Sequence, residues 1–297
     1  MSWVSATPPA VVSTQPRSLQ PQVLRQLWRT RSGKAGLILV GVVLLAAILS
    51  WIGLTPHPPQ EEDLHATLKG ISLNHLMGTD QFGRDVLAQV MQAMGVSLEI
   101  AGLATLIATV VGSLGGIAAG YLGGFTSTVI MRASDIMFAI PAILLALAIV
   151  AALGPGVVDS SLAIGVGYIP IVVRVVRAPV LSLNRTDFVS ATRVLGYSRT
   201  RVLLRHILPN VYGTVAVQAS LSLAWAILAE AGLSFLGLGP PPPTASLGQM
   251  VYSSTNFASF AWWTLAGPSL AIVIAVLGFN FIGDGLRDAT DPRSRRS

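Results

Sequence analysis

The sequence has no cysteine and unusually little charge. Only 11% of its 297 residues are charged, whereas soluble domains carry about 25%. Without cysteine, the chain can form no disulfide, no thiolate metal site and no cysteine nucleophile. With so few charges, too little polar surface is left to cover a soluble protein of this length. Together the two deficits exclude a disulfide-stabilised scaffold and argue against a water-soluble domain.

Recognisable catalytic motifs are missing from the sequence as well. There is no G-x-x-x-x-G-K-[ST], so Gly33-Lys34 is not a phosphate-binding loop, and neither H-E-x-x-H nor G-x-S-x-G occurs. His57, His65 and His75 fall in one polar stretch, but their spacing fits no metal-binding template. We therefore interpret them as solvated side chains and predict neither an active site nor a metal site.

Long apolar runs are abundant in this sequence. It is 52% hydrophobic with a mean hydropathy of +0.67, and about 20 apolar residues cross a bilayer as a helix. Six runs stand out: 35–54, 98–121, 129–153, 160–176, 210–236 and 263–283. The fourth is the weakest, but Arg174 and Arg177 lie at its end, where long side chains can reach the interface. The sequence predicts an all-α membrane protein with six transmembrane helices.

The positive charges predict how these helices are oriented. If both termini are cytoplasmic, Lys69 and Arg84 are the only two of the 19 lysines and arginines on the outside. Basic residues resist translocation, so this asymmetry fixes the topology. The first run is longer than the apolar core of a signal peptide, and we expect a retained anchor.

The runs also predict the division of the chain. We expect a partly disordered cytoplasmic tail, one transmembrane domain and a second cytoplasmic tail, at 1–34, 35–283 and 284–297. Within the domain, we expect external loops at 55–97 and 238–262 and a cytoplasmic segment at 184–210.

The cytoplasmic segment 184–210 combines an amphipathic helix, a glycine turn and a basic helix. Asp187 is placed to cap the first helix, Gly196 suits its left-handed end, and Ser198 can cap a second helix over 199–208, before Pro209. The first helix carries an apolar stripe of Phe188, Ala191, Thr192 and Leu195. This stripe either fits a groove on another protein or lies on anionic lipid, and the residues alone leave both open.

The same segment resembles the EAA loop of ABC importer permeases, whose pattern is Glu-Ala-Ala, three residues, Gly, and a closing Leu-Pro. Gly196 and Leu208-Pro209 match in spacing, while Ser190 replaces Glu and Thr192 the second Ala. In that family the loop is the coupling helix, which docks in a cleft of a cytoplasmic ATPase. The resemblance implies coupling roles for Asp187, Phe188, Ser190, Ala191, Thr192, Arg193, Leu195, Gly196, Arg199, Leu208 and Pro209.

Three further stretches narrow the resemblance to C-type permeases of dipeptide, oligopeptide and nickel importers. They are GTDQFGRDVL at 78–87, ILAEAGLSFLG at 227–237, and GDGLRDA at 283–289 followed by DPR at 291–293. The likeness covers residues 35–293 in order. It implies a six-helix permease of the bacterial inner membrane that works by alternating access. Peptides are the leading substrate, with nickel, glutathione or another small solute as alternatives.

The resemblance also implies a larger complex. The expected partners are a homologous B-type permease, two cytoplasmic ATPase subunits or domains, an external substrate-binding protein and membrane lipid, with no nucleic acid. ATP and Mg²⁺ would bind the partner ATPase, so we expect no cofactor and no enzymatic activity on this chain. A self-sufficient channel or secondary transporter is the alternative, but the two halves show no obvious inverted repeat.

Three local features in or beside the predicted spans carry predictions of their own. Glu230 is costly inside a span, so we expect either a hydrogen-bonded packing residue or a lining of the translocation path. Thr79 or Asp80 is placed to cap a short helix that runs toward Met94, ahead of the second span. Small residues recur every four positions in the second run and predict close packing of another helix: Ala104, Ala108, Gly112, Gly116 and Gly120.

Overall fold

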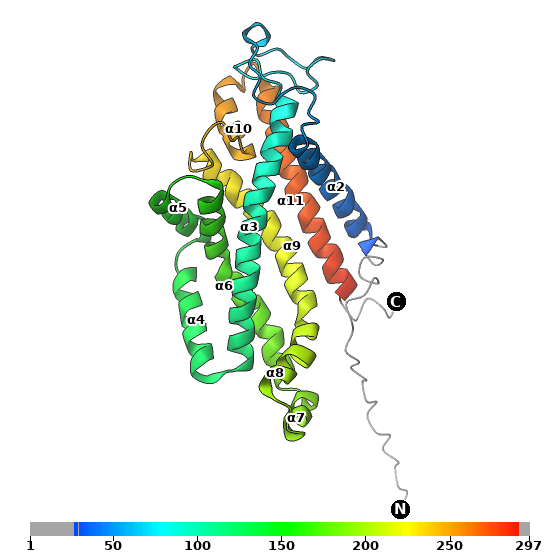
Figure 1. Ribbon diagram of the computed structural model, residues 1–297, viewed down its shortest axis with the longest axis vertical. Helices are drawn as coiled ribbons and strands as arrows, with labels where there is room; N and C mark the ends of the chain where they lie inside the picture. Colours follow the sequence, from blue (N-terminus) through cyan, green and yellow to red (C-terminus); the bar gives the residue numbers. More distant parts are fainter. Residues whose placement is uncertain (1–26, 29, 291–297) are drawn as a thin grey trace, which may run out of the picture.

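A computed structural model describes residues 27, 28 and 30–290 of the chain, and these form a helical bundle (Figure 1). Apart from one isolated bridge between Thr79 and Asp85, the described residues contain no β-structure. Five helices are long and apolar enough to cross a membrane: α2 (Arg31–Trp51), α3 (Val86–Tyr121), α6 (Val157–Asn184), α9 (Leu208–Phe235) and α11 (Trp262–Thr290). The all-α prediction is confirmed.

The remaining elements are short. A bent pair, α4 (Gly124–Phe138) and α5 (Ala142–Leu153), supplies the sixth crossing if the pair is counted as one span. The other short elements are η1 (Leu64–Ala66), α7 (Asp187–Val194), α8 (Arg199–Val202), η2 (Leu203–Ile207), α10 (Leu247–Ser254) and η3 (Thr255–Phe257).

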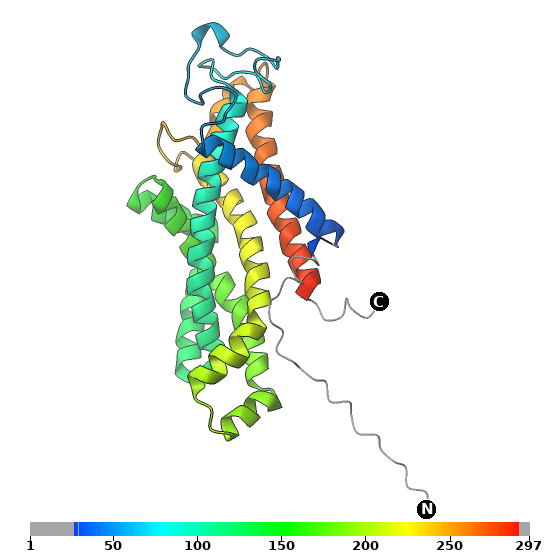
Figure 2. The same ribbon diagram turned by 45° about the vertical axis from the view of Figure 1, so that its right-hand side comes forward.

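The tightest helix pair is α3 against α6, which lie side by side along the bundle (Figures 1 and 2). Gly112, Gly116 and Gly120 of α3 face three fully buried valines of α6, namely Val172, Val176 and Val180. A Cβ atom on Gly112 would lie 2.5 Å from the Cβ of Val172, and one on Gly120 would lie 2.8 Å from the Cβ of Val180. The predicted small-residue seam is therefore confirmed.

A second pair joins the two ends of the described chain. α2 crosses α11 obliquely (Figure 2) and is again packed through glycine. A Cβ on Gly36 would lie 2.7 Å from the backbone nitrogen of Ile282. α11 continues to Thr290, so residues 284–290 are helical, where the sequence predicts a tail. Most of the predicted N-terminal tail, and the DPR motif at 291–293, lie outside the described residues.

The start of α3 corrects the prediction for the first external loop. Asp85 caps α3, because its Oδ1 accepts the backbone N–H of Ala88 at 2.8 Å. The helix then runs without a break to Tyr121, so no separate short helix ends near Met94. The prediction of a cap at Thr79 or Asp80 is wrong, since the Asp80 carboxylate instead accepts bonds from the backbone N–H groups of Phe82 and Arg84.

The third span is also corrected. The predicted run 129–153 is not one helix, because α4 and α5 meet at an angle of 85° across a short break. Pro141 explains the break, since proline lacks a backbone N–H and disfavours helical geometry in the residue before it. Arg174 of α6 holds α4 in place through a 2.9 Å bond to Asp135, and its guanidinium lies 4.3 Å from the centre of the Phe138 ring.

The fourth span is longer than predicted. α6 extends from Val157 to Asn184, and Pro170 and Pro179 are both accommodated inside it. Arg174 therefore lies within the helix and pairs with Asp135, where the sequence predicts an end from which it reaches the interface. The weakest of the predicted spans is thus a full-length helix.

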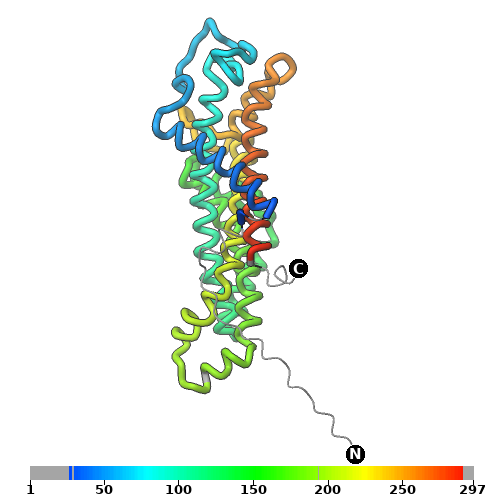
Figure 3. Tube along the Cα trace, turned by 90° about the vertical axis from the view of Figure 1, so that its right-hand side faces the viewer, coloured from blue at the N-terminus to red at the C-terminus, as the bar shows by residue number. Residues whose placement is uncertain are grey.

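Loops and short helices gather at the two ends of the molecule. Figure 3 shows the loop between α2 and α3 at one end of the long axis and the hairpin of α7 and α8 at the other. The long helices α3, α6 and α9 run between these ends (Figure 1). This arrangement places the 78–87 motif and the 184–210 segment at opposite ends of the bundle (Figure 3).

Candidate functional site

The hairpin of α7 and α8 reverses direction at a single glycine. Gly196 has φ +77°, in the left-handed region that favours glycine. Ser198 then caps α8, because its Oγ accepts the backbone N–H of Arg201 at 3.3 Å. Both local predictions are confirmed, and together they define a short, sharply turned element.

Two predicted boundaries of the hairpin are wrong. Asp187 is the first residue of α7 and not its cap, and the carbonyl of Thr186 accepts the N–H of Ser190. The second helix does not stop before Pro209, since α8 continues through the π-helical turn η2 directly into α9. Pro209 lies in the first turn of α9, where a missing N–H is tolerated.

This continuity joins the hairpin to a membrane span. The wide turn of η2 includes a bond from the N–H of Leu208 to the carbonyl of Leu203, five residues earlier. No loop separates α8 from α9, and Arg199–Phe235 satisfies the criteria for one membrane-spanning helix. The hairpin and α9 are therefore joined by continuous helix.

The two faces of α7 differ in what they contact. Val189 and Thr192 face inward and are buried, and Val189 packs in a cluster with Val202 and Ile207. Phe188, Ala191 and Leu195 face outward. Thr192 was predicted to share the outward stripe, but its position puts it on the inner face, where its hydroxyl donates to the carbonyl of Val189 at 2.7 Å. The stripe therefore divides between the two faces.

The outward face is strongly apolar although nothing in the described chain covers it. The residues Val194 and Leu195 are 87% and 72% exposed. The side chains of Arg199, Arg201 and Arg205 are exposed nearby on α8 and η2. The Arg193 side chain lies outside the described residues. An apolar tip beside arginines is suited to a partner surface with an apolar groove and an acidic rim.

One hydrogen bond attaches the hairpin to the end of α3, and a second joins this end of α3 to the end of α6. The Tyr121 hydroxyl donates to the carbonyl of Arg199 at 3.0 Å, and Asn184 Nδ2 donates to the carbonyl of Tyr121 at 3.2 Å. A cavity of about 510 Å³ lies here, lined by Tyr121, Leu122, Asn184, Tyr197 and Arg199. Sequence reasoning missed Tyr121 and Asn184, because no local pattern marks partners that lie more than sixty residues from each other.

Aromatic contacts also link the two arms of the hairpin, and they cover part of the otherwise exposed Phe188 ring. The Tyr197 ring stacks on His206 at 6.4 Å between centroids, and Phe188 meets the same imidazole edge-on at 5.3 Å. The guanidinium of Arg201 lies 5.4 Å from the centre of the Tyr197 ring. His206 therefore has a packing role at the turn.

Glu230 lies where three helices meet. It is 1% exposed, and its Oε1 accepts the Ser234 hydroxyl at 2.7 Å. The hydroxyls of Ser97 on α3 and Ser246 at the cap of α10 lie beside the same carboxyl group. Its Oε2 has no partner among the described residues. The enclosure of this side chain favours the packing interpretation over an open lining of the path.

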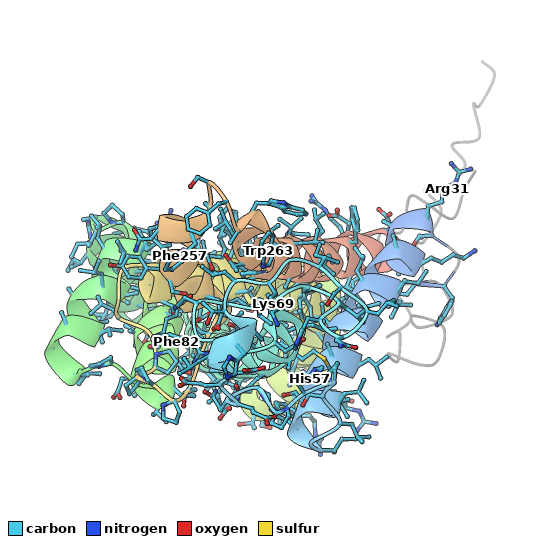
Figure 4. The ribbon with its side chains drawn as sticks, turned by 90° about the horizontal axis from the view of Figure 1, so that it is seen from above. Arg31, His57, Lys69, Phe82, Phe257 and Trp263 are labelled. Atoms are coloured by element: carbon cyan, nitrogen blue, oxygen red, sulfur yellow. The ribbon has the colours of Figure 1, made fainter. Side chains whose placement is uncertain are left out.

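The opposite end of the molecule carries a cavity of about 560 Å³ that is lined by both polar and apolar residues. Gln60 closes its edge, since Nε2 donates to Oε1 of Gln92 at 2.9 Å and to the carbonyl of Pro243 at 3.0 Å. Asp80 and Arg84 form an ion pair of 2.7 Å beside it. Figure 4 looks onto this end, with His57, Lys69 and Phe82 labelled on the loop between α2 and α3, which the sequence predicts to be external.

Comparison with known proteins identifies the family. The model of the "binding-protein-dependent transport system inner membrane component" family matches residues 112–296. The chain belongs to this family. It is therefore an ABC importer permease subunit, a multi-pass protein of the bacterial inner membrane, as the sequence resemblance implied.

Full-length relatives agree with this assignment. The chain is 44% identical to a putative peptide transport system permease protein of Brucella suis over 270 residues, which is 91% of this chain and 90% of the relative. It is 41% identical to the dipeptide transport system permease protein DppC of Escherichia coli, covering 92% and 94%. Identity to DppC of Alkalihalophilus pseudofirmus is 39%, covering 92% and 90%.

Proposed function

We propose that this permease carries peptides and that the hairpin of α7 and α8 couples it to an ATPase. The relatives are named as peptide and dipeptide permeases, which supports the substrate class. The coupling role rests on one observation, the exposed apolar tip of a hairpin that is continuous with α9. Nickel, glutathione and other small solutes are the alternatives within the same family.

The rest of the complex is proposed from membership of the family and from the resemblance to its C-type permeases. On this proposal, ATP and Mg²⁺ bind two cytoplasmic ATPase subunits or domains. A homologous B-type permease completes the translocation path, and an external binding protein delivers the substrate. On this proposal the chain has no enzymatic activity and no cofactor of its own.

The mechanism is alternating access driven through the hairpin. Closure of the ATPase pair moves Leu195 and its neighbours, and the movement passes through η2 to α9 without an intervening loop. The bonds from Tyr121 and Asn184 carry the same movement to α3 and α6. Arg193 and Arg199 are the proposed charge partners of the ATPase surface. Asp187, Ser190, Leu208 and Pro209 shape the hairpin that presents them.

The test is a charge placed on the apolar tip. We expect Leu195→Asp to prevent co-purification of the ATPase and to abolish uptake, because a carboxylate cannot enter an apolar groove without a large desolvation cost. Leu73→Asp is the matched control, since Leu73 is 96% exposed on the outer loop. It should leave both properties intact.

Two outcomes would contradict the proposal. If Leu195→Asp retains the ATPase and transports normally, the tip lies on lipid and does not dock. If the purified chain transports substrate without any ATPase, it is a channel or secondary transporter. The substrate class is tested separately, by mass spectrometry of the cargo carried by the binding protein encoded beside this chain.

A further inference from the structure

Two of the three outer-loop histidines converge on one buried carboxylate. His75 Nδ1 lies 2.9 Å from Asp85 Oδ2, and His57 Nδ1 lies 3.6 Å from the same oxygen. The two imidazole rings are 4.8 Å apart between centroids. We infer that His57, His75 and Asp85 form a binding site for a Zn²⁺-type transition metal ion on the outer face of the permease.

The donor set and its geometry fit such an ion. Two imidazole nitrogens and one carboxylate oxygen are a common ligand set for Zn²⁺, with a water in the fourth position. Ligand atoms about 2.0–2.2 Å from a tetrahedral ion lie about 3.3–3.6 Å from each other. The three donor atoms here all lie within 4.8 Å of one another, so small side-chain rotations bring them to that geometry.

Asp85 is held in position by its second oxygen. Oδ1 accepts the N–H of Ala88 and caps α3, which leaves Oδ2 directed at the two imidazoles. The Asp85 side chain is 1% exposed, so its orientation is set by packing. Metal ligands are commonly fixed in this way by a further hydrogen bond.

His57 supplies a ring nitrogen that has no hydrogen-bond partner in the described part of the chain and could ligate a metal ion. Its Nδ1 is buried and has no hydrogen-bond partner among the described residues. Buried polar atoms without partners are rare, and an ion that is not present is one of the recognised explanations. In the end-on view of Figure 4, His57 lies beside the end of α2, on the opposite side of the outer loop from Phe82.

The site would join three separate segments of the outer face. His57 follows α2, His75 belongs to the turn region that precedes α3, and Asp85 is the cap of α3 itself. A bound ion would therefore fasten the loop between His57 and His75 onto the start of α3. His65 lies in this same loop but is exposed and outside the cluster, which makes it a natural control.

The first measurement is metal binding by the detergent-purified complex, prepared with a tag that contains no histidine. Equilibrium dialysis with Zn²⁺ should give about one ion per permease chain, and Mg²⁺ should not compete because it prefers oxygen ligands. His57→Gln and His75→Gln should each weaken Zn²⁺ binding by at least about 10–100-fold, the loss seen even for outer-shell partners. His65→Gln should bind as the unmodified chain does.

The substitution Asp85→Asn distinguishes loss of the metal ligand from loss of the helix cap. Asparagine caps helices about as well as aspartate, so the fold should persist while the anionic ligand is lost. Limited proteolysis gives a second readout, because Zn²⁺ should slow trypsin cleavage after the exposed Lys69 in the unmodified chain and in His65→Gln, but not in His75→Gln.

The inference fails if the unmodified complex binds no Zn²⁺ at micromolar concentration. It also fails if the double variant His57→Gln, His75→Gln binds as tightly as the unmodified chain, or if His65→Gln is equally impaired. None of these results depends on the substrate or on coupling to the ATPase.

Discussion

At the scale of single residues, the turn between α7 and α8 depends on the backbone conformation of Gly196. Its φ of +77° is required for the reversal between α7 and α8, and no atom lies within 4 Å of where a Cβ would be. The constraint is thus on the backbone and not on space. Asparagine tolerates this conformation far better than valine does.

We therefore expect Gly196→Val to insert normally but to uncouple ATP hydrolysis from uptake. The left-handed conformation costs a β-branched residue about 1–2 kcal/mol, which is enough to shift the turn. Gly196→Asn should retain most of the coupling. ATPase activity and uptake measured together in proteoliposomes check both variants, and normal uptake by Gly196→Val would remove the turn from the mechanism.

Substitutions of Glu230 distinguish a packing role of this side chain from a role in transport. Glu230→Ala should lower the thermal midpoint of the purified complex, because it leaves a cavity and removes the acceptor of the Ser234 hydroxyl. We expect a loss of about 2–4 kcal/mol in unfolding free energy. Glu230→Gln keeps an acceptor oxygen and should lose much less.

Glu99 provides the matched control for this prediction, since it is an exposed carboxylate on α3. Glu99→Ala should leave the thermal midpoint unchanged. If Glu230→Ala keeps its stability and instead changes which solutes are taken up, the side chain lines the path and the packing role is wrong.

At the scale of elements, the α3–α6 seam depends on glycine. A Cβ on Gly116 would lie 2.7 Å from the carbonyl oxygen of Val173, so Gly116→Leu must push the two helices apart. Gly102→Leu on the same helix meets nothing within 4 Å. We expect the first variant to fail to accumulate in membranes and the second to accumulate normally, as measured by immunoblotting. Equal accumulation would contradict the seam.

The sequence was sufficient to predict those structural elements that depend on local sequence patterns. Apolar length predicted the long helices, and Gly196 and Ser198 predicted the turn and cap that the structure has. The sequence predicts tolerated kinks at Pro141 and Pro170 alike, but the chain bends by 85° at the break before α5, whereas α6 continues through Pro170. Only tertiary packing distinguishes a proline that breaks a helix, such as Pro141, from one that a helix accommodates, such as Pro170.

The site was predicted less completely than the fold. Periodicity placed Thr192 on the same stripe as Phe188, but only the contacts with α8 and η2 show which residues of α7 face inward. The three outer-loop histidines have no recognisable spacing, and two of them meet only because the loop folds back onto the cap of α3. Convergence of distant segments leaves no trace in a linear pattern.

At the scale of the whole molecule, the orientation in the membrane is the prediction to test. The absence of cysteine makes this simple, since a single introduced thiol has no background. We expect Thr200→Cys, on α8, to react with a membrane-impermeant maleimide only after the cells are opened. Asn74→Cys, on the outer loop, should react in intact cells. The reverse pattern would overturn both the topology and the coupling role.

The glycine–valine seam between α3 and α6 also limits how this molecule can change shape. Backbones in such close contact cannot slide by one residue without a collision between a valine and the opposite chain. The two helices must consequently tilt together as one rigid body. The translocation path would then open and close where the α3–α6 pair contacts other helices. Cross-links between α3 and α6 should therefore leave the turnover of transport unchanged.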